Sequence, residues 1–263
     1  MMDWNELWKR NQRQGKKFGQ REYWEKRAPS FTKQAAEGGY ARPFVEVVRP
    51  QRGWSVLDVG SGGGTVSVPL AHVVRQVTAL DFSGAMLKVL EERCRAEGLS
   101  NVRTVEAGWE DDWEARGIEP HDVVVASRSL IVEDLRSAIE KLNRFARKRV
   151  YVSASVGDGP RDRGLIEAVG REFKASPDYI YPYNVLHEMG IYANVEFIVN
   201  RINKACDTHE AAYEAIAWMV EEMTAEEEKK ARAYVESHLV KDGEKWKMDY
   251  DRLVRWAVIY WDL

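Results

Sequence analysis

Residues 56–65 read VLDVGSGGGT. The first four form an apolar run broken only by Asp58, which predicts a buried strand. The glycines that follow let the backbone approach a ligand closely, and the helix expected after them presents unpaired N–H groups at a positive end. A strand, a glycine-rich turn and a helix in this order predict a ligand site at the carboxyl end of the strand.

Strand and helix patterns alternate along the chain from this stretch onward. Short apolar runs predict strands at 56–59, 76–80, 102–105, 122–126, 150–154, 195–200 and 253–261. Helical spacing of apolar residues predicts helices at 66–74, 83–97, 135–147 and 185–190. Strands that alternate with helices imply right-handed crossovers and a mostly parallel sheet. We therefore predict an α/β fold with a doubly wound sheet.

Additions are expected around this α/β domain, which we place at residues 54–263. Residues 1–53 hold twelve Lys or Arg and six acidic residues, with aromatic residues at helical spacing, and predict an N-terminal helical cap. Residues 157–190 are expected to form a lid segment. Residues 201–250 are expected to form a helical insertion before the last strand, because two capping-box spacings mark helix starts. These spacings are Asp207 with Glu210 and Thr224 with Glu227.

The composition excludes several classes of protein. The 263 residues hold 39 basic and 42 acidic side chains, a net charge of −3, so no global basic field exists to attract nucleic acid. Two cysteines cannot build a disulfide framework or a Cys-rich zinc site, and no metal site is expected. No apolar run reaches the roughly 18 residues of a membrane span. We expect a cytoplasmic protein with no membrane partner.

Three ligand chemistries compete for the glycine-rich turn. A phosphate-binding P-loop requires Lys and then Ser or Thr after its last glycine, whereas Thr65 and Val66 stand there. The dinucleotide fingerprint requires Gly or Ala at the sixth position counted from Gly60, and Thr65 occupies that position. A nucleotide-dependent oxidoreductase is therefore an alternative that Thr65 disfavours. The glycine spacing after the strand suits a third ligand better.

This turn resembles motif I of the class I S-adenosylmethionine-dependent methyltransferases, and three later strand ends resemble further motifs of that family. Asp81 closes the second strand, as the acid of the family's second motif does. Residues 107–112, AGWEDD, resemble the adenine-binding motif, and 122–127, followed by Arg128, resemble the fourth-strand motif. The resemblance covers residues about 20–156. It implies a Rossmann-like, seven-stranded sheet with an antiparallel last strand, and S-adenosyl-L-methionine as cofactor.

The resemblance implies a set of cofactor-binding residues at these strand ends. Asp58 is expected to bind the methionine ammonium, to accept hydrogen bonds from the N–H groups of the glycine turn, or both. Asp81 is expected to accept hydrogen bonds from the ribose hydroxyls, the alternative being a helix cap beside Ser83. Trp109 either contacts adenine or packs as an ordinary aromatic residue. The full set is Tyr40, Asp58, Gly60, Ser61, Gly62, Gly64, Asp81, Phe82, Ser83, Met86, Trp109, Glu110 and Ser127.

Two features of the family pattern need candidates in this chain. Gly108 stands where relatives often carry an acid that binds the adenine amino group, and Glu110 or Asp111 can take that role. Relatives also often place an aromatic residue upstream of motif I, near the methionine end of the cofactor. Tyr40 and Trp24 are the candidates for that position.

The acceptor side is predicted from residues after the fourth strand and in the lid segment. Arg128 can bind a substrate carboxylate or phosphate with its forked guanidinium, or form an ion pair with Glu133 or Asp134. His187 is the candidate catalytic base, against a purely structural role. Aromatic residues of the lid can shield the sulfonium cation. The candidate substrate residues of the lid are Tyr181 and Tyr183.

These features together predict a methyltransferase that acts on a small molecule by in-line methyl transfer and yields S-adenosyl-L-homocysteine. Alignment of the acceptor with the sulfonium supplies much of the catalysis in such a displacement. An RNA or protein methyltransferase that uses the basic, aromatic residues 1–53 is one alternative. A non-catalytic binder of the cofactor is another.

Overall fold

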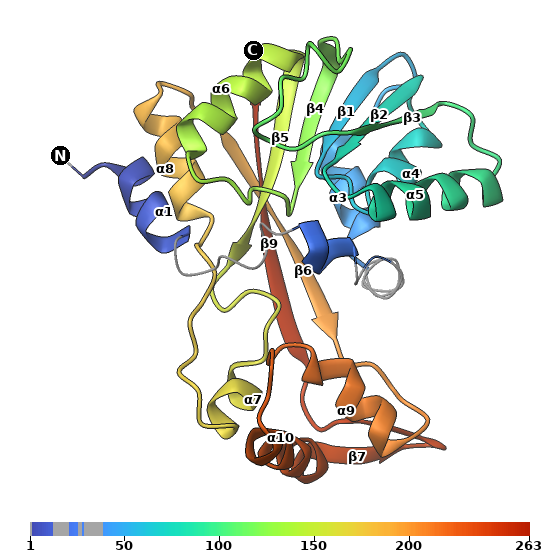
Figure 1. Ribbon diagram of the computed structural model, residues 1–263, viewed down its shortest axis with the longest axis vertical. Coiled ribbons are helices and arrows are strands. Elements are labelled where there is room, and N and C mark those ends of the chain that lie inside the picture. Colours follow the sequence, from blue (N-terminus) through green and yellow to red (C-terminus); the bar gives the residue numbers. More distant parts are fainter. Residues whose placement is uncertain (1, 13–20, 26–27, 29–38) are drawn as a thin grey trace. The chain divides into compact units, whose positions relative to one another are not determined.

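The computed structural model describes residues 2–12, 21–25, 28 and 39–263, which fold into two compact units (Figure 1). The first, here called the sheet unit, comprises Met1–Ala154, Pro177–Ile198 and Trp256–Leu263. The second, here called the insert unit, comprises Ser155–Ser176 and Val199–Arg255. Parts of the predicted N-terminal cap, at 13–20, 26–27 and 29–38, lie outside the described residues.

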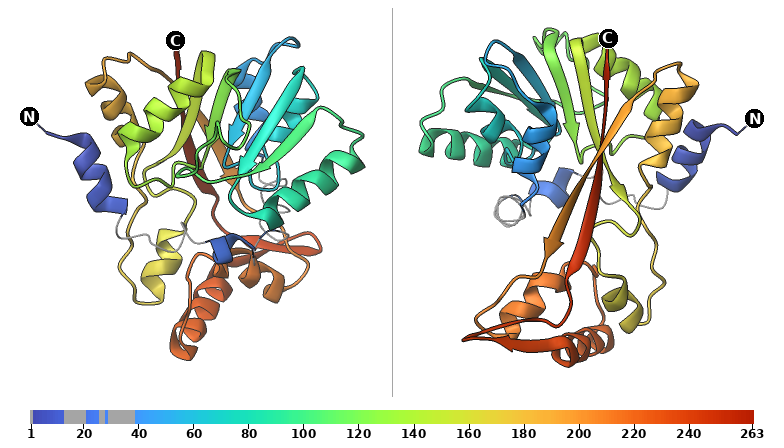
Figure 2. Two further views of the ribbon diagram at one scale, coloured as in Figure 1. Left: turned by 45° about the horizontal axis from the view of Figure 1, so that its top comes forward. Right: turned by 180° about the vertical axis from the view of Figure 1, so that it is seen from behind.

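The sheet has the order β3-β2-β1-β4-β5-β9-β6, and the predicted seven-stranded, mostly parallel α/β fold is confirmed. Its strands are β1 Ser55–Val59, β2 Gln76–Asp81, β3 Val102–Glu106, β4 His121–Ser127, β5 Ala146–Val156, β6 Asn194–Ile202 and β9 Arg252–Asp262. Parallel pairing joins β3 to β2, β2 to β1, β1 to β4 and β4 to β5. In the right-hand view of Figure 2, β9 runs opposite to β6. Because β1 to β4 are parallel, their carboxyl ends share one edge of the sheet.

The helices of the sheet unit follow the predicted pattern of apolar faces. They are α1 Trp4–Gln12, α3 Ala41–Val48, α4 Ser67–Ala71, α5 Gly84–Ala96, α6 Leu135–Phe145 and α8 Ile180–Glu188, and residues 21–25 are also helical. Helix α5 buries Met86, Leu87, Leu90 and Cys94, the face expected from the spacing. Helix α8 begins at Ile180, five residues before its expected start at Val185.

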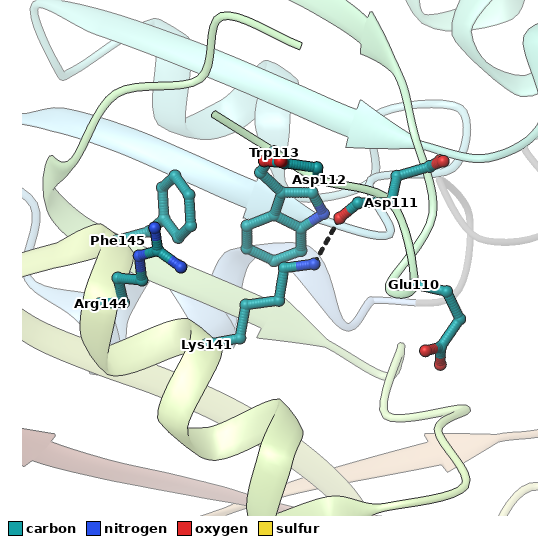
Figure 3. Close-up of a pocket in the computed structure, with 7 residues that line it drawn as sticks. All are labelled: Glu110, Asp111, Asp112, Trp113, Lys141, Arg144 and Phe145. Atoms are coloured by element: carbon teal, nitrogen blue, oxygen red, sulfur yellow. Dashed lines mark hydrogen bonds between the residues drawn. The ribbon is translucent and has the colours of Figure 1, made fainter. Parts of the chain in front are cut away.

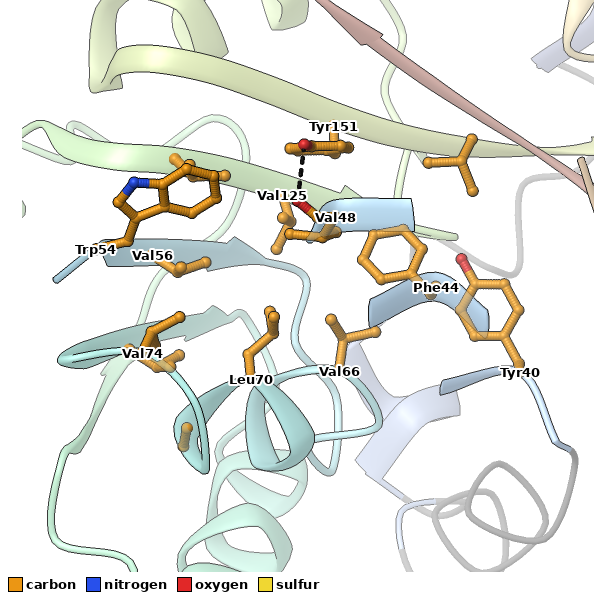
Figure 4. Close-up of a cluster of buried hydrophobic side chains, with 14 of the residues drawn as sticks. Tyr40, Phe44, Val48, Trp54, Val56, Val66, Leu70, Val74, Val125 and Tyr151 are labelled. Atoms are coloured by element: carbon orange, nitrogen blue, oxygen red, sulfur yellow. Dashed lines mark hydrogen bonds between the residues drawn. The ribbon is translucent and has the colours of Figure 1, made fainter. Parts of the chain in front are cut away.

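A cluster of buried apolar side chains lies between the strands β1, β4 and β5 and the helices α3 and α4 (Figure 4). Tyr40 and Phe44 lie in this cluster with their rings stacked at 5.6 Å. The hydroxyl of Tyr151 donates a hydrogen bond of 2.9 Å to the carbonyl of Val48, the last residue of α3. Three residues of the predicted cap, Tyr40, Phe44 and Val48, are therefore part of the core of the sheet unit.

The insert unit contains helices and a β-hairpin. Its elements are α7 Arg163–Ala168, α9 His209–Ala217, α10 Ala225–His238, β7 Leu239–Asp242 and β8 Lys245–Met248. The prediction that 201–250 is helical is wrong over the hairpin, where Gly243, with φ +63°, opens a two-residue turn between antiparallel strands. The predicted lid 157–190 is divided, because 155–176 belongs to the insert unit and α8 to the sheet unit.

The two predicted helix starts of the insert unit have different outcomes. Thr224 and Glu227 form the expected capping box of α10. Helix α9 is capped by Thr208 and not by Asp207, because the Thr208 hydroxyl accepts a hydrogen bond of 3.1 Å from the N–H of Ala211. None of the helices in the described ranges combines the length and apolar character needed to cross a membrane.

Candidate cofactor site

The glycine loop, Gly60–Thr65, is fastened to the end of the neighbouring strand β2. The N–H groups of Gly60 and Ser61 both donate to the carbonyl of Leu80, at 2.7 and 3.0 Å. The N–H of Gly62 donates to Oδ2 of Asp81 at 2.8 Å. The first two predicted motifs therefore form one structure, in which the acid of the second motif shapes the loop of the first.

The glycines of the loop have different surroundings. Gly60 and Gly64 have φ angles of +70° and +82°, and a Cβ would lie 2.4 Å from Ser129 and 2.3 Å from Leu90, respectively. At Gly62 the nearest atom to a Cβ would be the sulfur of Met86, at 4.0 Å. All three glycines have positive φ, since that of Gly62 is +53°, but only Gly60 and Gly64 are closely packed at the Cβ position, so space is available in front of Gly62.

Ser61 supplies a polar group that the protein itself does not use. Its residue is 6% exposed, and its hydroxyl has no hydrogen-bond partner. Buried polar groups in native structures almost always have a partner, so an unpaired hydroxyl in a ligand loop marks a place for a ligand atom. The open space at Gly62 adjoins it in the chain.

Asp58 is 1% exposed, and burial raises its pKa to about 7. Its Oδ2 accepts a hydrogen bond of 2.5 Å from the hydroxyl of Ser67 in α4, which opposes that rise. The expected bonds to the glycine loop are not formed, because the N–H groups of Gly60, Ser61 and Gly62 donate to the end of β2 instead. Asp58 remains the candidate for binding the methionine ammonium.

Asp81 is 5% exposed, and each of its oxygens accepts a backbone hydrogen bond. Oδ2 accepts from Gly62 at 2.8 Å and Oδ1 from Ser83 at 2.9 Å. Burial raises the pKa of Asp81, while these hydrogen bonds oppose the rise. The cap of α5 is Ser83, whose hydroxyl accepts from the N–H of Met86 at 3.3 Å. Because each carboxylate oxygen has a second lone pair, Asp81 can still accept bonds from two ligand hydroxyls.

The loop after β3 divides the roles of its acidic residues. Oδ2 of Asp111 accepts a hydrogen bond of 2.7 Å from the N–H of Gly108, so this carboxylate closes its own loop. Glu110 and Asp112 are both exposed, and Asp112 accepts a hydrogen bond of 3.1 Å from the N–H of Ala115. The indole N–H of Trp109 donates to the carbonyl of Ser129 at 3.0 Å, which ties the third motif to the fourth.

A surface pocket lies on another side of this loop, against α6 (Figure 3). The ammonium of Lys141 donates to the carbonyls of Trp109 and Asp111, at 2.7 and 2.6 Å, and lies 4.4 Å from the ring centre of Trp113. The pocket is lined by Glu110, Asp111, Asp112, Trp113, Lys141, Arg144 and Phe145. Neither the glycine loop nor the two buried aspartates line it, so we do not assign the cofactor to this pocket.

Arg128, directly after β4, is held in a left-handed conformation with φ +57°. Its N–H donates to the hydroxyl of Ser153 at 2.9 Å, and its guanidinium carbon lies 4.1 Å above the ring centre of Tyr40 and 5.6 Å from that of Trp256. Across the described residues, no carboxylate lies within ion-pair distance of this guanidinium. The alternative ion pair is therefore wrong, and Asp134 instead pairs with Lys9 at 2.9 Å.

Tyr40 is brought to the ends of β4 and β5. Its hydroxyl lies 2.8 Å from the hydroxyls of both Ser127 and Ser153, and burial raises its pKa. Of the two candidates for the upstream aromatic residue, Tyr40 thus joins the strand-end residues. Trp24 packs edge-to-face on Tyr23, with ring centres 5.2 Å apart.

The three candidates on α8 have other surroundings. The hydroxyl of Tyr181 accepts a hydrogen bond of 2.6 Å from Asn11, and its ring lies 5.7 Å from that of Trp4, so it packs between α1 and α8. His187 is exposed and lies edge-to-face with Tyr192 at 5.9 Å. In the described structure, no hydrogen bond or ring contact joins these residues or Tyr183 to the strand-end residues.

Residues of α1 hold the loop after β4, and the sequence reasoning missed them. The indole N–H of Trp8 donates to the carbonyl of Val132 at 2.9 Å. Oδ1 of Asn5 accepts from the N–H groups of Leu135 and Arg136, at 3.0 and 3.1 Å, and so caps α6 from outside the helix. The helical spacing of the first tryptophans predicts only that this segment packs on something larger.

Comparisons with known proteins agree with this geometry. Residues 56–149 match a family described as "Methyltransferase domain". An uncharacterized protein of Haemophilus influenzae is 31% identical over 250 residues, which cover 91% of this chain and 88% of that protein. A ubiquinone/menaquinone biosynthesis C-methyltransferase of Allorhizobium ampelinum is 30% identical over 151 residues, 53% of this chain and 58% of its own. A Bacillus halodurans structure described as a methyltransferase has a TM-score of 0.57 at 15% identity, covering 86% and 99% of the two chains.

The fold, the linked strand-end motifs and these matches define a class I methyltransferase. Residues 56–149 belong to this methyltransferase family, and the chain is related over most of its length to the Haemophilus influenzae protein. S-adenosyl-L-methionine is the cofactor that the class implies. The residues present fit this cofactor, because the unpaired Ser61 hydroxyl, the space at Gly62 and the carboxylate of Asp81 occur together at one strand edge. The oxidoreductase alternative is set aside by this assignment.

Proposed function

We propose that the methyl acceptor is a small molecule, methylated by in-line transfer. The observation that carries this proposal is the burial of the polar groups around the ends of β4 and β5. Tyr40 and Ser153 are each 1% exposed, and Ser129 is 8% exposed. Because these groups are buried, they favour a small acceptor that can enter a pocket over a macromolecule that binds to an open surface.

The charges of the N-terminal zone also favour a small acceptor over RNA. Lys9 pairs with Glu6 at 3.0 Å and with Asp134 at 2.9 Å. Arg21 pairs with Glu106 at the end of β3. Basic residues neutralised in this way contribute little to a phosphate-binding surface, which depends on free positive charge. The Allorhizobium relative supports a small acceptor too, because its name refers to the biosynthesis of ubiquinone and menaquinone, which are small molecules.

The strand-end residues divide the work of holding the cofactor. Asp81 accepts hydrogen bonds from the ribose hydroxyls, and Ser61 donates its hydroxyl beside the open backbone of Gly62. Glu110 binds the adenine amino group, because Asp111 is already engaged with its own loop. When bound, S-adenosylmethionine supplies the methyl group of its sulfonium to the acceptor.

Tyr40 and the serines around it orient groups at the acceptor side. The Tyr40 hydroxyl is fixed between Ser127 and Ser153, so the side chain cannot change its χ1 rotamer without breaking two hydrogen bonds. A ring fixed in this way can restrict the approach of the acceptor to one direction, which is what an in-line displacement requires.

The proposal is tested by following a labelled methyl group from S-adenosylmethionine into separated fractions of a cell extract. The fractions are low-molecular-weight compounds, RNA and protein. We expect the label in the low-molecular-weight fraction with the wild-type protein, and a strongly reduced signal with Asp81→Asn. Label that enters only RNA or protein would contradict the small-molecule proposal, and loss of RNA labelling on deletion of residues 1–27 would then identify the N-terminal zone as the RNA-binding part.

A further inference from the structure

Arg128 is fixed in place, and no acidic side chain among the described residues forms an ion pair with it. Its backbone N–H is bonded to Ser153, and its guanidinium lies over the ring of Tyr40. A non-glycine residue with φ +57° is held by its surroundings against its own preference, and such positions cluster at ligand sites. A charged guanidinium that is part-buried without a carboxylate needs a negative group to compensate its lost hydration.

Arg128 lies beside the carboxyl end of β1, the strand that carries Asp58. Asp58 faces Val125 in the parallel register, and Arg128 follows three residues later on β4. The next residue, Ser129, donates its hydroxyl to the carbonyl of Val59 at 2.5 Å. The negative charge of Asp58 also acts on the pKa of Arg128, and the positive charge of Arg128 on that of Asp58. A buried acidic residue and a part-buried arginine therefore belong to neighbouring strands at the same end of the sheet, and Ser129 links the end of β1 to the residue after Arg128.

We infer that Arg128 binds the carboxylate of the cofactor's methionine moiety, and not an acid group of the acceptor. The methionine moiety is a zwitterion, so one ligand group satisfies both protein charges, with its ammonium toward Asp58 and its carboxylate toward Arg128. A simple anionic acceptor bound to Arg128 would leave Asp58 beside a second negative charge. The planar guanidinium also matches a carboxylate with two parallel hydrogen bonds.

This inference rests on the cofactor and not on the identity of the acceptor. Ser129, the residue after Arg128, packs against the glycine loop. A Cβ atom on Gly60 would lie only 2.4 Å from the Cβ of Ser129. The packing of Ser129 therefore places the backbone of Arg128 next to the glycine loop. The residue that the sequence suggested for the substrate becomes a cofactor residue.

The test compares two ligands by titration calorimetry: S-adenosylmethionine and decarboxylated S-adenosylmethionine, which lacks only the carboxylate. Wild-type protein is expected to bind the decarboxylated ligand roughly 10- to 100-fold more weakly, the range for losing hydrogen bonds between charged groups. Arg128→Gln is expected to bind S-adenosylmethionine more weakly by the same factor. The two ligands should then differ by less than about threefold.

Arg136→Gln is the matched control, because Arg136 is nearby in sequence, part-exposed and paired with Glu188. The decarboxylated ligand also carries one more net positive charge, and this control measures the general effect of removing a positive side chain. It should keep the wild-type preference. Arg128→Lys, which retains the charge without the fork, should keep part of the preference, and it replaces Arg128→Gln if that variant does not fold.

Two outcomes would overturn the inference. One is an Arg128→Gln variant that folds and prefers S-adenosylmethionine as strongly as the wild type, which would mean that the carboxylate binds elsewhere. The other is unchanged affinity for both ligands together with loss of methyl transfer to acidic small molecules, which would assign Arg128 to the acceptor. Both outcomes are independent of the fraction that receives the methyl group, so the proposed acceptor class is tested separately.

Discussion

Buried aspartates occur in both units, and the groups that surround them differ. Asp81 in the sheet unit is 5% exposed, and its oxygens accept bonds from the backbone N–H groups of Gly62 and Ser83. Beside it in the glycine loop, the hydroxyl of Ser61 has no partner. The carboxylate therefore shapes a loop that still has hydrogen-bonding capacity to offer.

In the insert unit, Asp162 is also 5% exposed, but its partners come from the interior of that unit. Its oxygens accept from the N–H of Leu165 at 3.0 Å, from the hydroxyl of Tyr250 at 2.6 Å and from that of Tyr234 at 3.4 Å. The two tyrosine hydroxyls also lie 2.9 Å apart. A buried acid thus indicates a ligand site only where neighbouring polar groups are left open, and Asp162 is a structural residue.

Asp162→Ala is expected to give the largest loss of stability. It leaves the hydroxyls of two part-buried tyrosines and the N–H of Leu165 without this acceptor, at about 1 kcal/mol each, so the free energy of unfolding should fall by about 3 kcal/mol. Urea denaturation measures this loss. Asp158→Ala, which removes an exposed ion pair with Arg163, is the control and should cost less than about 1 kcal/mol. Equal losses of unfolding free energy for the two variants would contradict a structural role for Asp162.

Gly64→Ala is expected to destabilise the sheet unit, because it strains the backbone of the glycine loop. The added methyl group would meet Leu90 at 2.3 Å, and φ +82° is unfavourable for alanine. Strain and overpacking together should lower the free energy of unfolding by about 2 kcal/mol and weaken cofactor binding. Gly170→Ala, at φ +91° with no atom within 4 Å, isolates the backbone strain, and thermal unfolding compares the two. A smaller loss at Gly64 than at Gly170 would contradict the packing argument.

The raised pKa of Asp58 predicts a pH dependence that the insert unit should not share. Burial raises this pKa from a value near 4 to about 7, so its contribution to the stability of the cofactor-free protein is present at low pH and is lost as pH rises through 7. The ammonium of the cofactor favours the ionised form, so binding releases a proton. Affinity for S-adenosylmethionine should therefore rise about tenfold between pH 5.5 and 7.

Calorimetry in buffers of different ionisation enthalpy measures this proton release directly. Asp58→Asn should flatten the dependence, because it removes the titrating group. A wild-type affinity that stays constant over this pH range would show that the ammonium does not act on Asp58.

The features that could be predicted from the sequence are those that depend on short, continuous segments of the chain. The end of a strand, a glycine spacing and an acid at the end of the next strand are local patterns, and they predicted a role for both Asp81 and the glycine loop, which a hydrogen bond links. The capping box at Thr224 was predictable for the same reason. The hairpin in the insert unit was not, because each of its strands has only four residues and carries charged side chains, which resemble a solvated helix.

Long-range contacts account for the other misses. Nothing in the sequence near Asn5 indicates that its amide caps a helix that begins at Leu135, because that contact spans 130 residues. Arginine has no preference for a left-handed backbone, so the conformation of Arg128 depends on Ser153 and Tyr40 in the folded chain. Sequence reasoning therefore proposes Arg128 as a site residue but does not distinguish the two ligands it could bind.

The central claim is that the strand-end acid Asp81 holds the cofactor and the equally buried Asp162 does not. Titration of S-adenosylmethionine into three proteins, the wild type, Asp81→Asn and Asp162→Asn, tests it most directly. We predict that the wild type binds, that Asp81→Asn binds roughly 30-fold more weakly or worse, and that Asp162→Asn stays within about threefold of the wild type. Absence of binding by the wild type, or equal affinity of the wild type and Asp81→Asn, would contradict the account.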